Sequence, residues 1–147
     1  MVLAGVLMVF RGRYFGLDPT SKQLTDFEAG LHRTMALMTA SHKRVYYFMP
    51  VVEPGFDPRL CVGELPWGRK PPRACEIDQK NTTRTFETLR QVLQAVQTRY
   101  PNLQVIDPNV HICDNGLCPM FRDGHSLFKD DNHLSYYGSI WIGQKLK

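Results

Sequence analysis

The sequence predicts an α/β fold, in which a parallel sheet carries helices on both of its faces. Three observations lead to this prediction. Short apolar runs rich in β-branched and aromatic residues have the composition of buried strands. Longer segments repeat their apolar residues at three- and four-residue steps, as one face of a helix does. The two kinds of segment alternate along the chain, which is typical of parallel sheets covered by helices.

The first half of the chain supplies two strands and one helix. Residues 2–10, VLAGVLMVF, form an apolar run that predicts a buried strand. Because the chain begins directly in this strand, we expect the domain to be incomplete at its N-terminus. Residues 44–52, RVYYFMPVV, predict the next strand, with Pro50 near its end. The helix between them is predicted from its apolar positions Leu24, Phe27, Leu31, Met35 and Met38.

The second half adds two helices and one strand. Residues 82–100 predict a helix with Thr82 or Thr83 as its N-cap. Residues 102–108, NLQVIDP, predict a short strand. In the helix predicted over residues 82–100, the apolar positions are Phe86, Leu89, Leu93, Val96 and Tyr100. A closing helix is predicted over residues 134–146, with Leu134, Tyr137, Trp141 and Ile142 facing inward.

Composition and charge exclude several classes of protein. The chain of 147 residues has the length of one domain, and we treat residues 1–147 as a single partial domain. The net charge is +4, but the 18 Lys and Arg residues are scattered, so no nucleic-acid partner is expected. No segment approaches the roughly 18 consecutive apolar residues of a membrane span. Nothing in the sequence calls for a cofactor.

Four cysteines flank two loops. We expect disulfides between Cys61 and Cys75 and between Cys113 and Cys118, because both spacings are short. The first pair encloses part of a long irregular segment, residues 53–80, and such a link contributes about 3 kcal/mol by restricting the unfolded chain. Disulfides would place the domain outside the cytoplasm. The alternative is four reduced thiols.

A zinc site is a second alternative for the later cysteines. His111, Cys113 and Cys118 lie close together in sequence, and His125 supplies a fourth possible ligand. The step of five residues between the two cysteines exceeds the usual two to four residues between zinc ligands. Zinc requires thiolates, so thiol counting and metal analysis separate this alternative from a disulfide.

The candidate catalytic residues lie in the segment LFKDDNHLSYYG, residues 127–138. His133 can exchange a proton near neutral pH. A carboxylate at the other ring nitrogen fixes the tautomer, and Asp130 lies three residues earlier, within reach of one turn. Asp131 is expected to cap the final helix or to be solvated. An ordinary polar turn before a helix is the alternative interpretation.

Together with its neighbours, this segment resembles the C-terminal block of the SGNH hydrolase superfamily. More narrowly, it resembles the SGNH domain that is fused to membrane acyltransferases of the acyltransferase-3 family. VIDP before the third cysteine and the strand VYYFMPVVEP also fit, so the resemblance covers nearly the whole chain. The matching residues are Cys61, Arg73, Cys75, Cys113, Cys118, Asp123, Gly124, Phe128, Asp130, Asn132, His133, Leu134, Ser135 and Gly138.

The resemblance implies a flavodoxin-like SGNH fold and an O-acyltransferase or esterase acting on cell-surface glycans. In such proteins a Ser carries the acyl group, and a His and an Asp activate this Ser. In this chain the His would be His133 and the Asp would be Asp130. The implied partners are an acyl donor, a glycan acceptor and a membrane acyltransferase domain in the parent protein. The implied location is the periplasmic or extracytoplasmic face of a bacterial inner membrane.

The sequence departs from the family at the nucleophile. The family places it in a Gly-Asp-Ser block, and residues 1–147 contain no such block. Ser135 is expected to cap the final helix instead. We therefore expect a domain that carries the base without its nucleophile and is inactive by itself. A carbohydrate esterase remains an alternative, as does a glycan-binding module that uses Trp67 and Phe56 to stack on sugar rings.

Overall fold

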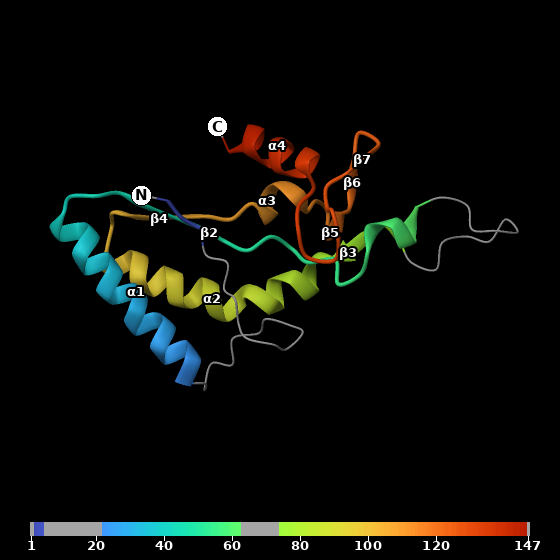
Figure 1. Ribbon diagram of the computed structural model, residues 1–147. Helices are drawn as coiled ribbons and strands as arrows, with labels where there is room; N and C mark the ends of the chain where they lie inside the picture. Colours follow the sequence, from blue (N-terminus) through green and yellow to red (C-terminus); the bar gives the residue numbers. More distant parts are fainter. Residues whose placement is uncertain (1, 5–21, 63–73, 147) are drawn as a thin grey trace, which may run out of the picture. The chain divides into compact units, whose positions relative to one another are not determined.

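The computed structural model describes residues 2–4, 22–62 and 74–146 (Figure 1). The chain divides into two compact units, which we treat separately. The sheet unit comprises Met1–Pro50 and Thr83–Asp107. The disulfide unit comprises Val51–Thr82 and Pro108–Lys147. No helix within the described residues is both long enough and apolar enough to cross a membrane.

The sheet unit contains a parallel sheet of three strands, in the order β1-β2-β4. These are β1 (Val2–Ala4), β2 (Val45–Phe48) and β4 (Leu103–Ile106). The register pairs Val2 with Tyr46 and Val45 with Leu103. The predicted α/β fold with a parallel sheet is therefore confirmed. Most of the predicted first strand, residues 5–10, lies outside the described residues.

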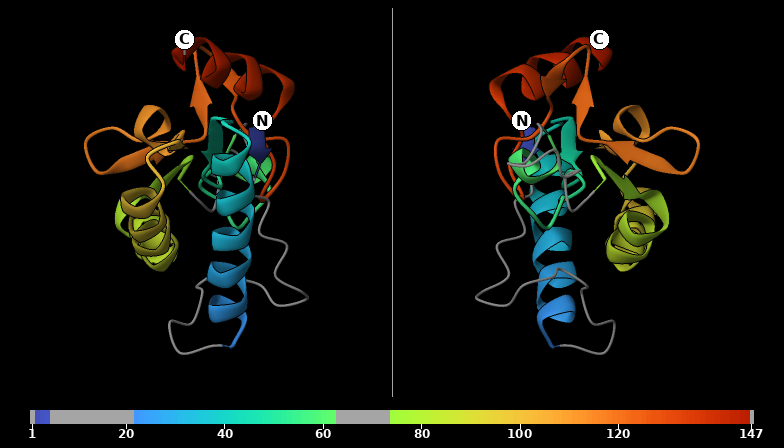
Figure 2. Two further views of the ribbon diagram at one scale, coloured as in Figure 1. Left: turned by 90° about the vertical axis from the view of Figure 1, so that its left-hand side faces the viewer. Right: turned by 90° about the vertical axis from the view of Figure 1, so that its right-hand side faces the viewer.

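Two helices pack against this sheet, α1 (Lys22–Ala40) and α2 (Gln79–Arg99). Figures 1 and 2 show both helices on the same side of the strands, whereas helices were predicted on both faces of the sheet. The inward strand residues Val45, Tyr47 and Leu103 belong to one core with both helices. Every apolar position predicted for the two helices is buried or packs against this core: Leu24, Phe27, Leu31, Met35, Met38, Phe86, Leu89, Leu93, Val96 and Tyr100.

The start of α2 differs from the prediction. The helix begins at Gln79, so Thr82 and Thr83 lie within it and neither is the N-cap. Asp78 satisfies one of the free amides of the first turn, because its Oδ1 accepts a hydrogen bond from the Lys80 N–H at 2.8 Å. The first turn is thus served by an aspartate just before the helix and not by a threonine.

The disulfide unit consists of short elements. Its core is formed by a contiguous set of buried residues: Val52, Cys61, Ile112, Cys113, Cys118, Met120, Leu127, Phe128 and Ile142. Strands β3 (Glu76–Asp78) and β5 (Leu117–Pro119) pair antiparallel, as do β6 (Phe121–Arg122) and β7 (His125–Ser126). The remaining elements are the 3-10 helix η1 (Pro58–Cys61) and the helices α3 (Asn109–Ile112) and α4 (Tyr136–Lys145).

This unit contains two tight turns, at Asn115–Gly116 and at Asp123–Gly124. Asn115 and Gly116 have φ values of 50° and 83°, and Asp123 and Gly124 have φ values of 51° and 77°. Two successive positive φ values are typical of the two-residue hairpin turn for which Asn-Gly and Asp-Gly are the preferred sequences. The first turn joins Asp114 to Leu117, and the second joins β6 to β7. Both dipeptides were therefore a readable signal.

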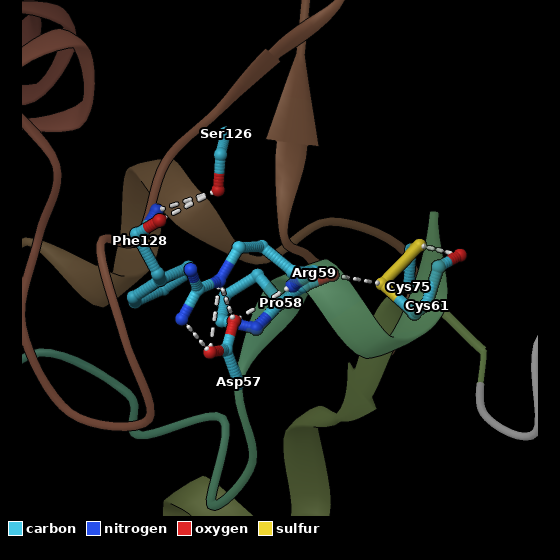
Figure 3. Close-up of a disulfide and its surroundings, with 7 residues drawn as sticks. All are labelled: Asp57, Pro58, Arg59, Cys61, Cys75, Ser126 and Phe128. Atoms are coloured by element: carbon cyan, nitrogen blue, oxygen red, sulfur yellow. Dashed lines mark hydrogen bonds and ion pairs between the residues drawn. A yellow bond between two sulfur atoms is a disulfide. The ribbon is translucent and has the colours of Figure 1, made fainter. Parts of the chain in front are cut away.

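Both predicted disulfides are present, Cys61–Cys75 and Cys113–Cys118. Figure 3 shows the first, which links the end of η1 to the residue that precedes β3. The zinc alternative is wrong, because the sulfur atoms of Cys113 and Cys118 are bonded to each other and are not thiolates.

Removal of the longer cross-link should destabilise the protein. We expect Cys61→Ala/Cys75→Ala to lower the free energy of unfolding by about 3 kcal/mol, because the open chain gains loop entropy on unfolding. Urea denaturation of both proteins measures the difference. Thiol counting under denaturing conditions is the control and should find no free thiol in either. An unchanged free energy of unfolding would contradict the stabilising role.

Candidate active site

His133 lies in a short loop that backbone hydrogen bonds close at its base. The Lys129 N–H donates to the His133 carbonyl at 2.9 Å, and the Ser135 N–H donates to the Leu127 carbonyl at 2.9 Å. Phe128 and Leu134 form an isolated antiparallel bridge between these two contacts. The loop therefore has a fixed shape, although the His133 side chain is 69% exposed.

The Asp130 carboxylate organises the interior of this loop. Its Oδ1 accepts hydrogen bonds from the N–H groups of Asn132, at 3.1 Å, and His133, at 2.8 Å. The same carboxylate faces the His133 ring, with Nδ1 3.0 Å from Oδ1 and 3.1 Å from Oδ2. One side chain thus fixes both the backbone and the imidazole of the residue three positions later.

These contacts keep the carboxylate ionised. Hydrogen bonding to the Asn132 N–H lowers the pKa of Asp130 below its ordinary value, and the hydrogen bonds and charge of His133 lower it further. An ionised carboxylate beside Nδ1 favours the tautomer that carries its proton there, which leaves Nε2 as the basic nitrogen. Among the described residues, Asp130 is the only hydrogen-bond partner of the ring.

A second loop, residues 51–57, meets the histidine loop within the disulfide unit. The Gly55 N–H donates to the Asp131 carbonyl at 3.0 Å. Burial raises the pKa of Glu53, the negative charge of Asp131 raises it further, and the charge of His133 lowers it. Glu53 was not among the predicted site residues; its only sequence signal is a Glu-Pro pair directly after a predicted strand. Asp131 is exposed and does not cap the final helix.

Ser135 is the cap of α4, as predicted. Its Oγ accepts a hydrogen bond from the Gly138 N–H at 2.9 Å and donates to the Ser126 carbonyl at 2.5 Å. The hydroxyl is therefore engaged at both its donor and an acceptor position. Gly138 is required here because a Cβ at this position would lie 2.0 Å from the Leu127 carbonyl oxygen.

The described serines of the disulfide unit provide no partner for His133. Ser126 and Ser139 donate their hydroxyls to the backbone carbonyls of Phe128 and Ser135. Ser41 lies in the sheet unit, and Ser21 lies outside the described residues. Asp130 and His133 thus lie together within the described part of the disulfide unit, and no described serine of that unit donates its hydroxyl to the ring.

Of the two aromatic residues predicted to stack on sugar rings, only Phe56 lies within the described residues. Phe56 is half-buried and packs against the core of the disulfide unit, while Trp67 lies outside the described residues. Figure 3 also shows the Asp57–Arg59 ion pair at the start of η1. The four cysteines serve the fold through the two disulfides.

The sequence matches one known protein family. The family model of the SGNH domain, described as fused to AT3 domains, matches residues 2–147. The chain belongs to this SGNH family. No significant match was found among curated proteins or among solved structures. The membership confirms the resemblance that the cysteine and Asp-x-x-His motifs indicated.

Family membership supports a domain of the hydrolase or acyltransferase type. SGNH domains of this kind are fused to AT3 domains, which are membrane acyltransferases, so the family is associated with membrane proteins. The family model covers almost the whole chain, including the segment that contains Asp130 and His133.

The lowered pKa of Asp130 predicts a pH-dependent effect of Asp130→Asn. A depressed pKa contributes stability above the ordinary value of 3.8, and this contribution is lost as the pH falls through the folded-state value. We expect the variant to be less stable than the wild type at pH 7 and the difference to shrink below about pH 4. Urea unfolding across this range measures it, with the exposed Asp114→Asn as control. A difference in stability that is constant with pH would contradict a lowered pKa of Asp130 in the folded protein.

The contact at Gly138 predicts opposite effects for two substitutions in one helix. Gly138→Ala should destabilise by about 3 kcal/mol, because the new methyl group overlaps the Leu127 carbonyl. Gly143→Ala, where a Cβ meets nothing within 4 Å, should stabilise by about 0.5–1 kcal/mol. Thermal and urea unfolding of both variants test the pair. Equal effects would show that α4 tolerates a side chain at its first turn.

Proposed function

We propose that this chain is the base-bearing part of an SGNH O-acyltransferase domain that transfers an acyl group, such as acetyl, to a hydroxyl of a cell-surface polysaccharide. The observation that carries the proposal is the Asp130–His133 pair, with Nδ1 held at 3.0 Å from the carboxylate. Membership of the SGNH family adds support, because its domains are fused to membrane acyltransferases.

The proposed reaction has two steps. In the first, Nε2 of His133 takes the proton from a serine hydroxyl while the serine oxygen attacks the acyl carbonyl, and the proton then passes to the leaving group of the donor. In the second, Nε2 takes the proton from a sugar hydroxyl, which attacks the acyl-serine. The imidazolium returns this proton to the departing serine oxygen. Asp130 stabilises the imidazolium in both steps.

The serine of this mechanism is proposed to come from a Gly-Asp-Ser block outside residues 1–147. No such block is present in the sequence, and the described serines near the site donate their hydroxyls to backbone carbonyls. By this proposal, the chain is the C-terminal portion of an SGNH domain. The two disulfides favour an oxidising compartment, so we place the domain on the extracytoplasmic side.

Ester hydrolysis is the second candidate reaction. The His133 side chain is 69% exposed, so water can approach Nε2 as well as a sugar hydroxyl can. With water as the acceptor, the same pair would act as a carbohydrate esterase. The products distinguish the two reactions, because transfer yields an acylated glycan and hydrolysis yields a free acid.

The proposal predicts that His133→Ala removes activity. In a polypeptide that joins this chain to its Gly-Asp-Ser block, acyl transfer should fall by roughly 10⁴- to 10⁶-fold, because the nucleophile loses its base. Acylated glycan and released acid are quantified together. His111→Ala, in the same unit, is the control and should leave activity unchanged.

Residues 1–147 by themselves should hydrolyse a simple acetyl ester no faster than their own His133→Ala variant. Full activity of His133→Ala in the joined polypeptide would overturn the proposal.

A further inference from the structure

The hairpin of β6 and β7 contacts α4 through aromatic side chains. The Tyr137 hydroxyl donates to Asp123 Oδ2 at 3.0 Å, and the Tyr137 and His125 ring centres are 4.6 Å apart. One helical turn further along α4, the guanidinium carbon of Arg122 lies 5.8 Å from the centre of the Trp141 ring. The two elements that are joined by the histidine loop are therefore also held together by side chains.

Two cationic side chains approach the same Trp141 ring. Arg122 reaches it from the hairpin, and the Lys145 Nζ lies 5.5 Å from the ring centre, on the last turn of α4. Both distances are typical of cation–π contacts. The two positive charges repel each other, because both are brought to one ring. Trp141 is half-buried and packs against the core of the disulfide unit, which gives this pair of charges a fixed platform.

Neither cation has an acidic partner among the described residues, whose ion pairs all involve other side chains. Asp123 follows Arg122 directly but accepts its hydrogen bond from Tyr137. The Arg122 Nη2 donates to the Ile112 carbonyl at 3.3 Å, while Nε is buried without a hydrogen-bond partner. Buried donors are normally satisfied, so the fold leaves this guanidinium with unused capacity. A guanidinium matches carboxylate and phosphate groups in geometry and charge.

We propose that Arg122, Trp141 and Lys145 form a subsite for an acidic sugar, whose carboxylate or phosphate group binds the two cations. The exposed part of the Trp141 ring would contact the C–H groups of the same sugar, because their partial positive charge is attracted to the π face. The inference rests on the proposed function in one respect, since it takes this sugar to belong to the glycan acceptor. The glycan would then be held within the unit that contains His133.

The test is a fluorescence titration of the full 147-residue chain carrying Trp67→Phe, in which Trp141 is the remaining one of the two tryptophans. Oligogalacturonate, a chain of carboxylated sugars, should change the Trp141 emission in a saturable way, and its affinity should fall as salt is added. A neutral malto-oligosaccharide of the same length should cause no change at the same concentrations. Glucuronate and glucose 6-phosphate compared at equal concentration identify the preferred acidic group, and saturable binding of either supports the inference.

Charge variants in the same background locate the site. Lys145→Gln should weaken oligogalacturonate binding roughly fivefold, because it removes one cation near the ligand. Lys145→Arg keeps the charge and should restore most of the affinity. Lys80→Gln removes an exposed lysine of the same unit, is the matched control and should leave binding unchanged. Arg122→Gln should weaken binding further, and Lys145→Gln decides alone if that variant fails to fold, since Lys145 is exposed.

The subsite is disproved if no acidic sugar gives a saturable change, or if Lys145→Gln binds as tightly as the Lys80→Gln control. Equal binding of the neutral oligosaccharide would also disprove it. These titrations need no catalysis, so their failure is distinguishable from failure of the proposed function. Loss of the subsite would leave the His133-dependent acyl transfer intact, and retained transfer in His133→Ala would leave the binding result intact.

Discussion

The candidate site depends on one carboxylate that serves the backbone and the imidazole at once. Asp130 accepts hydrogen bonds from two successive N–H groups and also lies within 3.0–3.1 Å of the His133 Nδ1. The backbone contacts define the turn, and the turn brings the ring to the carboxylate. The geometry that general-base chemistry needs is therefore a by-product of the way in which the loop satisfies its own amides.

The surrounding structure holds this loop by close backbone contact. Ser135 caps α4 and also donates to the Ser126 carbonyl, so one hydroxyl connects the helix to the strand before the loop. Gly138 allows the first turn of α4 to approach Leu127. Together these contacts fix both ends of the histidine loop, and its polar middle remains exposed to solvent.

The features that the sequence predicted correctly depend on local pattern. The apolar faces of α1 and α2 follow the helical period, because packing against a sheet selects one stripe of side chains. The Asp130–His133 contact follows from a spacing of three residues. Features that depend on distant partners were missed. Glu53 becomes noticeable only when Gly55 is seen bonded to Asp131, and Asp78 was overlooked as the start of α2 because it also ends a strand. The Asn115–Gly116 and Asp123–Gly124 turns had a local signal and were missed only because their flanking strands are very short.

The closeness of Asp130 and His133 along the chain has a consequence for folding order. A contact between residues three positions apart closes a minimal loop and loses little chain entropy, so it can form early and independently of long-range pairing. A serine supplied from another part of a domain must instead wait until the parallel sheet has assembled. The Asp130–His133 pair would then have a low contact order and the contacts of the serine a high one. Formation of the serine's contacts would determine when the proposed active site is first complete.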